Sequence, residues 1–122
     1  MDRWEAQYAF WASFGVPAYE ENSVPDRGEI SYPYITFQKV LTPFYGRTVV
    51  NPSVWTRSPS WAEADALALS IFERTDGGGA PISFDGGSIQ AYADENNFAQ
   101  SMGDPEDDLI KRYRLSVILD FS

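Results

Sequence analysis

The sequence predicts an α+β fold, in which an antiparallel or mixed sheet of about five strands carries two helices on one face. Two segments, at 2–14 and 60–74, have the helical spacing of apolar residues, whereas the others alternate polar and apolar residues as strands do. Connections between segments are mostly short, which favours the packing of neighbouring elements. The 122 residues are enough for one hydrophobic core, so we expect residues 1–122 to form a single domain with the order α-β-β-α-β-β-β.

The first expected helix, at 2–14, has clear signals at both ends. Asp2 and Glu5 have the spacing of a capping box, in which each side chain accepts from the other's backbone N–H. Gly15 and Pro17 then end the helix. Its apolar stripe consists of large aromatic residues, namely Trp4, Tyr8, Phe10, Trp11 and Phe14. Either the helix is a central core helix, or part of this stripe contacts another subunit.

Two strands are expected before the second helix. After a connector at 15–33, alternation with period two predicts a strand at 34–40, and a turn at 42–46 leads to a second strand at about 47–58. Asn51 and Pro52 interrupt the second strand. Since proline has no N–H for the ladder, we expect this strand to be bulged there or to lie at a sheet edge.

The segment from Trp55 to Glu63 joins the second strand to the second helix. Pro59 ends the strand, the Ser60 hydroxyl is expected to cap the helix, and Glu63 has the spacing to complete a capping box. The helix has one apolar face, formed by Trp61, Ala64, Leu67, Ala68 and Ile71. It ends before the glycines at 77–79, which we interpret as a turn.

The last three expected strands follow this helix. Two short strands, at 80–84 and 88–93, form a hairpin across a tight turn at 85–87. Residues 94–108 are expected to be a polar, acidic loop, and residues 109–121 a single long strand. One face of that strand carries Tyr113, Leu115, Val117, Leu119 and Phe121, and the other carries Arg112, Arg114, Ser116 and Asp120.

The composition offers few catalytic groups. The chain has no cysteine and no histidine, which removes thiolate nucleophiles, zinc sites built on sulfur and the usual general base near neutral pH. The glycines at 77–79 follow a helix rather than open one, unlike a phosphate-binding loop. The acidic segment at 104–108 lacks the ligand periodicity and central glycine of a calcium loop. We therefore expect no enzyme, cofactor or metal site, and a carboxylate-based enzyme is the remaining catalytic alternative.

Eighteen acidic residues against nine basic ones give a net charge of −9. Such a surface repels nucleic-acid phosphates and anionic membranes. Eight acidic residues and no basic one lie between Arg74 and Lys111, and basic residues then cluster at 111–114. These blocks are either solvated faces or self-complementary contacts between copies. No segment approaches the roughly 20 apolar residues of a membrane span, and residues 1–5 do not resemble a signal peptide, so we expect a cytoplasmic protein.

Several short segments, in matching order over most of the chain, carry a family resemblance. They are FWASFGVPAYE at 10–20, SVP at 23–25, PYITF at 33–37, SVWTRS at 53–58, SWAE at 60–63, FAQSM at 98–102 and KRY at 111–113. Together they resemble small tail-component proteins of siphophages and their prophages, from the region that joins head to tail. The resemblance implies a tail terminator or neck protein with an α+β fold. Such proteins assemble, usually as hexameric rings, at the top of the tail tube, where they stop tube polymerisation and dock the head.

The resemblance also implies partners and a location. The partners are other copies of the chain, the tail tube protein and a head-completion protein, first in the host cytoplasm and then in the virion tail. DNA passes through the ring without specific binding, and an acidic lumen would repel its phosphates. Our candidates for lumen-facing residues are Asp94, Glu95, Asp104 and Glu106. Our candidates for the subunit interface are Trp4, Trp11, Arg57, Asp107, Asp108, Lys111, Arg112 and Arg114, with the basic residues at 111–114 against a neighbour's acidic 104–108.

Two other functions stay open at this point. One is another head–tail connector, either a head-closure or a joining protein. The other is an acidic DNA mimic that occupies a DNA-binding enzyme of the host, which the net charge of −9 suggests. Mimics usually spread acidic residues along helices, however, whereas the two helices expected here are aromatic or alanine-rich.

Overall fold

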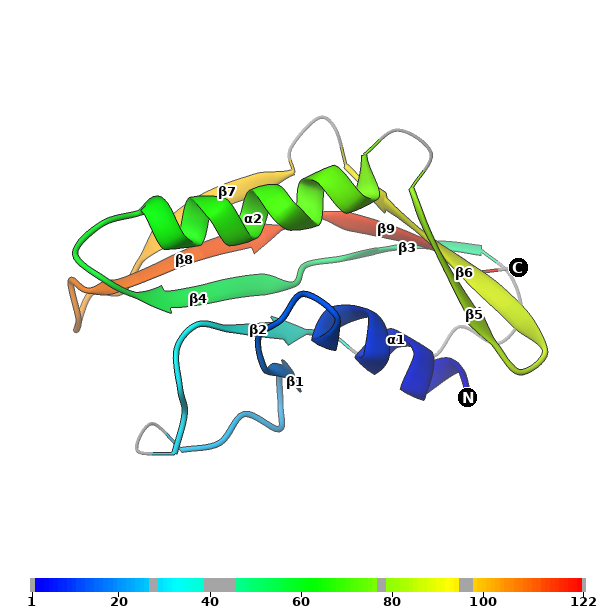
Figure 1. The fold of residues 1–122 in the computed structure, drawn as a ribbon, viewed down its shortest axis with the longest axis horizontal. Coiled ribbons are helices and arrows are strands. Elements are labelled where there is room, and N and C mark those ends of the chain that lie inside the picture. The colour runs from blue at the N-terminus through cyan, green and yellow to red at the C-terminus, as the bar shows by residue number, and fades with distance from the viewer. Residues whose placement is uncertain (1, 27–28, 39–45, 77–78, 95–97, 122) are drawn as a thin grey trace.

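Two helices and two mostly antiparallel sheets form the described part of the chain (Figure 1). The computed structural model describes residues 2–26, 29–38, 46–76, 79–94 and 98–121. Its elements are α1 (Arg3–Ala12), β1 (Ala18–Glu20), β2 (Tyr34–Phe37), β3 (Gly46–Val50), β4 (Ser53–Arg57), α2 (Ala62–Thr75), β5 (Ala80–Phe84), β6 (Gly87–Ala93), β7 (Ala99–Gly103), β8 (Ile110–Leu115) and β9 (Val117–Phe121). The predicted α+β class is confirmed.

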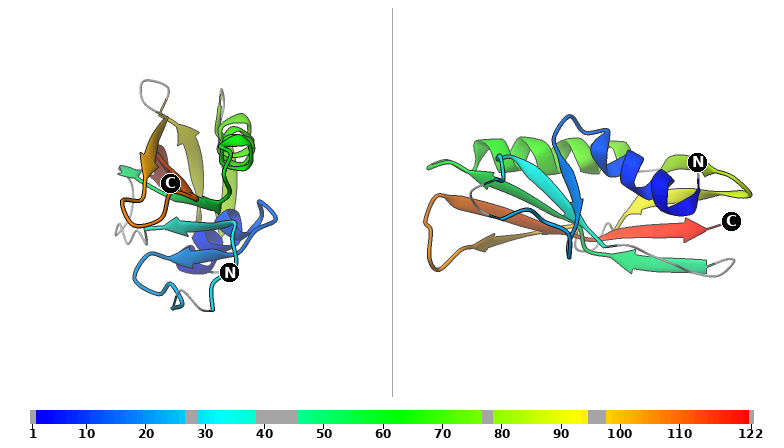
Figure 2. Two further views of the ribbon diagram at one scale, coloured as in Figure 1. Left: turned by 90° about the vertical axis from the view of Figure 1, so that its left-hand side faces the viewer. Right: turned by 90° about the horizontal axis from the view of Figure 1, so that it is seen from below.

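The strands divide between two sheets. A five-stranded sheet has the order β1-β2-β4-β8-β7, and a four-stranded sheet has the order β3-β9-β6-β5. The strand pairs are antiparallel except for β1 and β2, which are parallel. Seen from below, α1 and α2 lie on the same side of β8 and β9 (Figure 2, right). No helix in the described ranges has both the length and the apolar character needed to cross a membrane.

Two long stretches of chain, β3–β4 and β8–β9, each run through both sheets. Asn51 and Pro52 separate β3 from β4, and Ser116 separates β8 from β9. The breaks lie side by side, because Asn51 Nδ2 donates to Leu115 O at 3.1 Å and to Ser116 Oγ at 3.3 Å. The interruption predicted at Asn51 is therefore a change of sheet, and the predictions of one strand at 47–58 and one at 109–121 are wrong.

α1 begins as predicted and packs its aromatic residues into the core. Asp2 Oδ1 accepts from the Glu5 N–H at 2.7 Å, and the Glu5 carboxylate accepts from the Asp2 N–H. Trp11 and Phe10 are 1% and 6% exposed. Trp11 is therefore a core residue, and it leaves almost no side-chain surface for the predicted contact with another subunit. Trp4 is partly buried, with its ring 5.6 Å from that of Phe37.

α2 begins at Ala62, two residues later than predicted. Its N-cap is Trp61, and no side chain accepts a capping hydrogen bond there. Ser60 Oγ accepts instead from the Ala62 N–H at 3.1 Å. Because Glu63 is then only the second residue of the helix, it is one position short of the capping-box spacing. The predicted capping box between Ser60 and Glu63 does not form.

The acidic loop predicted at 94–108 contains a strand, β7. It pairs antiparallel with β8 and forms one edge of the five-stranded sheet. All five of its residues are exposed, so it lacks the buried face that would give alternation in the sequence. The turn from β7 to β8 contains the acidic residues at 104–108. Gly77, Gly78, Glu95 and the turn predicted at 42–46, apart from Gly46, lie outside the described residues.

The core lies between the helices and the two sheets. Its largest fully buried side chains include Trp11, Phe37, Phe121, Ile35, Ile71, Ile89, Leu115 and Leu119. The alternation predicted for the C-terminal strand is confirmed in β9, where Val117, Leu119 and Phe121 are buried. The hairpin of β5 and β6 is also confirmed, with Gly86 at φ +94° in its turn. α2 and β7 lie on either side of a hollow in the surface.

Candidate assembly interface

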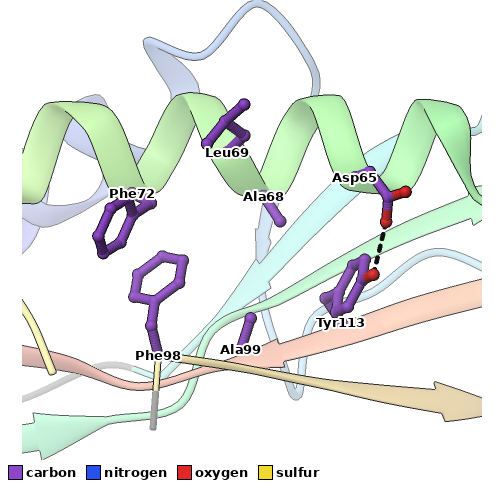
Figure 3. A pocket seen from close by; sticks show the side chains of 7 residues that line it. All are labelled: Asp65, Ala68, Leu69, Phe72, Phe98, Ala99 and Tyr113. Carbon is purple, nitrogen blue, oxygen red and sulfur yellow. Dashed lines mark hydrogen bonds between the residues drawn. The ribbon is translucent and has the colours of Figure 1, made fainter. Parts of the chain in front are cut away.

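A hollow of about 350 Å³ lies between α2 and the edge strand β7 (Figure 3). Its lining is mostly apolar and consists of Asp65, Ala68, Leu69, Phe72, Phe98, Ala99 and Tyr113. The rings of Phe72 and Phe98 meet edge to face with their centroids 5.0 Å apart. Leu69 is 53% exposed at the rim. An apolar side chain of another molecule can therefore be accommodated here with little loss of water from polar groups.

One end of this hollow is polar. The Tyr113 hydroxyl donates to Asp65 Oδ1 at 2.5 Å. This hydrogen bond raises the pKa of Tyr113, and burial and the Asp65 charge act in the same direction. Tyr113 is partly buried but Asp65 is exposed, so the Asp65 carboxylate places a negative charge at the rim. The hollow thus combines an apolar floor with an anionic end.

The strand that borders the hollow has an unprotected outer edge. β7 has the sequence AQSMG, with no charged residue and no proline. Edge strands of monomeric proteins usually carry such residues, or a bulge or cover, because unpaired backbone groups attract other strands. Within the described ranges, β8 is the sole strand paired with β7. β7 therefore offers backbone N–H and C=O groups to a further strand.

The opposite face of the five-stranded sheet carries a stack of aromatic and cationic groups. The rings of Tyr34 and Trp55 are nearly parallel, at 5°, with centroids 5.8 Å apart. The Arg112 guanidinium lies 4.4 Å from the centre of the Trp55 ring, and its Nε donates to Ser53 Oγ at 3.0 Å. Burial lowers the pKa of Arg112, and the charge of Arg114 acts in the same direction. We call this side of the sheet, where Trp55 and Arg112 are partly exposed and Tyr34 is buried beneath other groups, the aromatic face.

The basic residues predicted to act together at 111–114 lie on two faces of the sheet. Lys111 is on the α2 side, where Nζ donates to Asp108 O and lies 5.7 Å from the centre of the Trp61 ring. Arg112 is on the aromatic face, beside Arg114, whose Nη2 donates to Asn51 Oδ1 at 3.1 Å. Because neighbouring residues of a strand point to opposite faces, these three cations do not form one patch.

The other predicted interface residues already have contacts within the chain. Arg57 Nε lies 3.1 Å from Asp107 Oδ2, in an ion pair across β4 and the turn after β7. Asp107 Oδ1 also accepts from the Leu109 N–H at 2.9 Å. Asp108 is exposed. A neighbouring copy would have to compete with these internal contacts for Arg57 and Asp107.

The predicted lumen-facing residues are separated by the length of β7. Asp94 lies at the junction of the sheets, where its N–H donates to Ser116 O at 3.1 Å. Asp104 and Glu106 lie beyond the other end of β7, where Asp104 Oδ1 accepts from the Glu106 N–H at 2.8 Å. Five residues of strand span about 17 Å, so these acids do not form one cluster. Glu95 is not among the described residues.

The residues that line the hollow were not found from the sequence. Leu69 and Phe72 lie outside the apolar face predicted for the second helix, and Phe98 lies in the segment predicted as an acidic loop. Large apolar residues at positions expected to face solvent are the signal that could have revealed them. In the described ranges, no three Asp or Glu residues are grouped closely enough to hold a metal ion.

Comparison of the chain with protein-family models, with curated proteins and with solved structures found no match.

Proposed function

We propose that this chain is a non-enzymatic phage assembly protein, a tail terminator whose copies form a ring at the head-proximal end of the tail tube. There the ring stops tube polymerisation and docks the head. The observation that supports this most directly is the apolar hollow beside the unprotected edge of β7. A surface of this kind is stable in water when another chain covers it.

The geometry of this surface favours a ring over a symmetric dimer. The hollow lies between α2 and one edge of the five-stranded sheet, and it is not self-complementary, since an anionic rim would face a second anionic rim. An unlike surface of the next copy must therefore cover it. Contacts between unlike surfaces repeat around an axis and close into a ring when the rotation allows it.

The segments that resemble phage tail components coincide with this surface. The resembling segment at 98–102 comprises Phe98 and most of β7, and the one at 111–113 ends at Tyr113. Both segments therefore contribute side chains to the hollow. The likeness and the exposed surface therefore involve the same residues, and both support a function in assembly.

Electron microscopy of the purified protein, alone and with tail tubes of its phage, tests this proposal. We expect rings, or added density at one end of each tube, and tubes of limited length when the protein is present during polymerisation. Density on the head and not on the tube would instead indicate another head–tail connector. A protein that stays monomeric and never binds a tube would overturn the proposal.

A pair of variants on α2 links the activity to the hollow. Leu69→Glu places a charge at the apolar rim, whereas Ala66→Glu places the same charge on an exposed part of the same helix. We expect the first variant to lose ring formation and tube capping and the second to keep both, because a charge next to apolar surface that becomes buried is costly. Circular dichroism would confirm that both variants are folded.

A further inference from the structure

We propose that the strand that covers β7 is β3 of a neighbouring copy. The five-stranded sheet of one subunit would then continue into the four-stranded sheet of the next. This inference rests on the proposed function, because it names the contact by which copies join.

The four sheet edges differ in how well they are protected. β1 has three residues and ends in the charged Glu20, and β5 contains Pro81, which cannot donate to a ladder. β7 and β3, at Ala99–Gly103 and Gly46–Val50, have five residues each and no proline. No described strand pairs with the outer edge of either one. β3 carries one charged residue, Arg47, whereas β7 carries none. These two five-residue edges without proline belong to different sheets, as a contact between unlike surfaces requires.

The exposed side chains of β3 match the hollow in chemistry. Val49 is 56% exposed, and the Arg47 side chain is 69% exposed. Both point to the outer face of their sheet, opposite Ile118 and Asp120 of β9. Arg47 Nε lies 3.4 Å from Asp120 Oδ2 of its own chain, so the contact with Asp65 would compete with this exposed pair, and the apolar contact of Val49 is the stronger part of the match. An apolar side chain and a cation on one face of a strand correspond to the apolar floor and the anionic rim of the hollow.

The spacing of these groups also agrees. Residues two apart on a strand are separated by about 7 Å, as are Arg47 and Val49. Asp65 and Leu69 are four residues apart on α2, which is about 6 Å along a helix. Because α2 runs alongside β7 and β8 (Figure 1), Arg47 can lie next to Asp65 while Val49 contacts Leu69.

These contacts fix the direction and register of the added strand. Asp65 binds Tyr113, which is opposite Ser101 of β7, whereas Leu69 lies in the hollow with Ala99. Arg47 beside Ser101 and Val49 beside Ala99 give an antiparallel pair. In this register Thr48 is directly opposite Gln100.

The same arrangement places the neighbour over the aromatic face. Val50 points into the core of its own chain, on the side of β3 opposite to Val49. If Val49 faces α2 of the first copy, the body of the neighbour lies on the other side of the first copy's five-stranded sheet. That side carries Trp55 and Arg112.

Disulfide cross-linking tests the register directly, because the natural chain has no cysteine. The double variant Thr48→Cys, Gln100→Cys is oxidised in the presence of tail tubes and analysed on a non-reducing gel. Directly opposite residues have Cβ atoms about 5 Å apart, close enough for a bridge after small shifts. Within one chain, β3 and β7 lie at opposite ends of the long axis, so the bridge must join two copies (Figure 2, right).

We expect a ladder of covalent oligomers up to the size of the ring. Adding Val49→Asp to the double variant should reduce the cross-linked product about tenfold, because the hollow would have to accept a buried charge. Ser83→Cys with Gln100→Cys is the matched control for the other edge of the four-stranded sheet, and it should give no ladder.

Three results would overturn the inference. The first is cross-linking of the control pair instead, which would make β5 the partner. The second is dimerisation of Gln100→Cys alone, which would mean pairing of β7 with β7. The third is the formation of rings on tubes without any bridge between Thr48→Cys and Gln100→Cys, which would leave the proposed function standing. The absence of rings and of tube binding would overturn both.

Discussion

The hydrogen bonds of Asn51 hold the point at which both long strands change sheet, so Asn51→Ala tests how that junction is stabilised. The variant removes two bonds donated by Nδ2, to Leu115 O and Ser116 Oγ, at 3.1 and 3.3 Å. Each is part-buried and worth about 0.5–1.5 kcal/mol net. The bond accepted from Arg114 is exposed, and water replaces it at little cost. The Asn51 N–H keeps its bond to Gln38 Oε1.

We therefore expect Asn51→Ala to lower the free energy of unfolding by about 2 kcal/mol. Urea unfolding followed by tryptophan fluorescence measures this loss. With a urea dependence of about 1.5 kcal/mol per molar, the midpoint should fall by about 1.3 M. Asn22→Ala is the matched control, because its side chain bonds Glu20 in an exposed turn, and it should change stability by less than about 0.5 kcal/mol. Equal losses in the two variants would refute this account of the junction.

Three further substitutions give distinct readouts of stability. Tyr113→Phe removes a hydrogen bond that raises the pKa of the tyrosine above its usual 10.0. The contribution of that bond is present below pH 10 and lost as the pH rises through the raised pKa, so wild type and variant should differ in urea unfolding at pH 8 and converge as the pH rises through that pKa. Gly79→Ala, at φ +79° and with its Cβ 2.7 Å from a carbonyl oxygen, should lower the melting temperature more than Gly86→Ala, at φ +94° in open space. Thr56→Val removes one part-buried hydrogen bond, to Lys111 O at 3.1 Å, and should cost about 1 kcal/mol in urea unfolding.

The elements predicted correctly are those with local causes. The capping box of α1 depends on Asp2 and Glu5 alone, and the hairpin of β5 and β6 depends on a glycine turn. Burial of alternate residues in β9 gives a pattern that the sequence displays directly. Such signals do not require knowledge of which strands pair.

The elements predicted wrongly depend on partners far away in the sequence. Ser116 is a small polar residue in an otherwise regular strand, and its role as a break follows from its contact with Asn51. β7 has no buried face, so its strand conformation comes from the ladder with β8 and leaves no alternation in the sequence. Leu69 and Phe72 lie outside the apolar face that the helical spacing predicts. The spacing predicts one apolar face for α2 and does not indicate that these two residues line a hollow on its other side.

The internal contacts of the charged residues decide which force can drive assembly. The interface predicted from charge uses residues such as Arg57 and Asp107, which already pair with each other. Surface ion pairs contribute about 0–1 kcal/mol and weaken with salt, and exchanging one partner for another gains less still. Val49 and Leu69 are each more than half exposed, and burying both would contribute about 2 kcal/mol, which salt does not screen. Assembly through β3 and β7 should therefore persist at 1 M NaCl, whereas assembly through the acidic and basic segments should be lost. Sedimentation in low salt and in 1 M NaCl would distinguish the two.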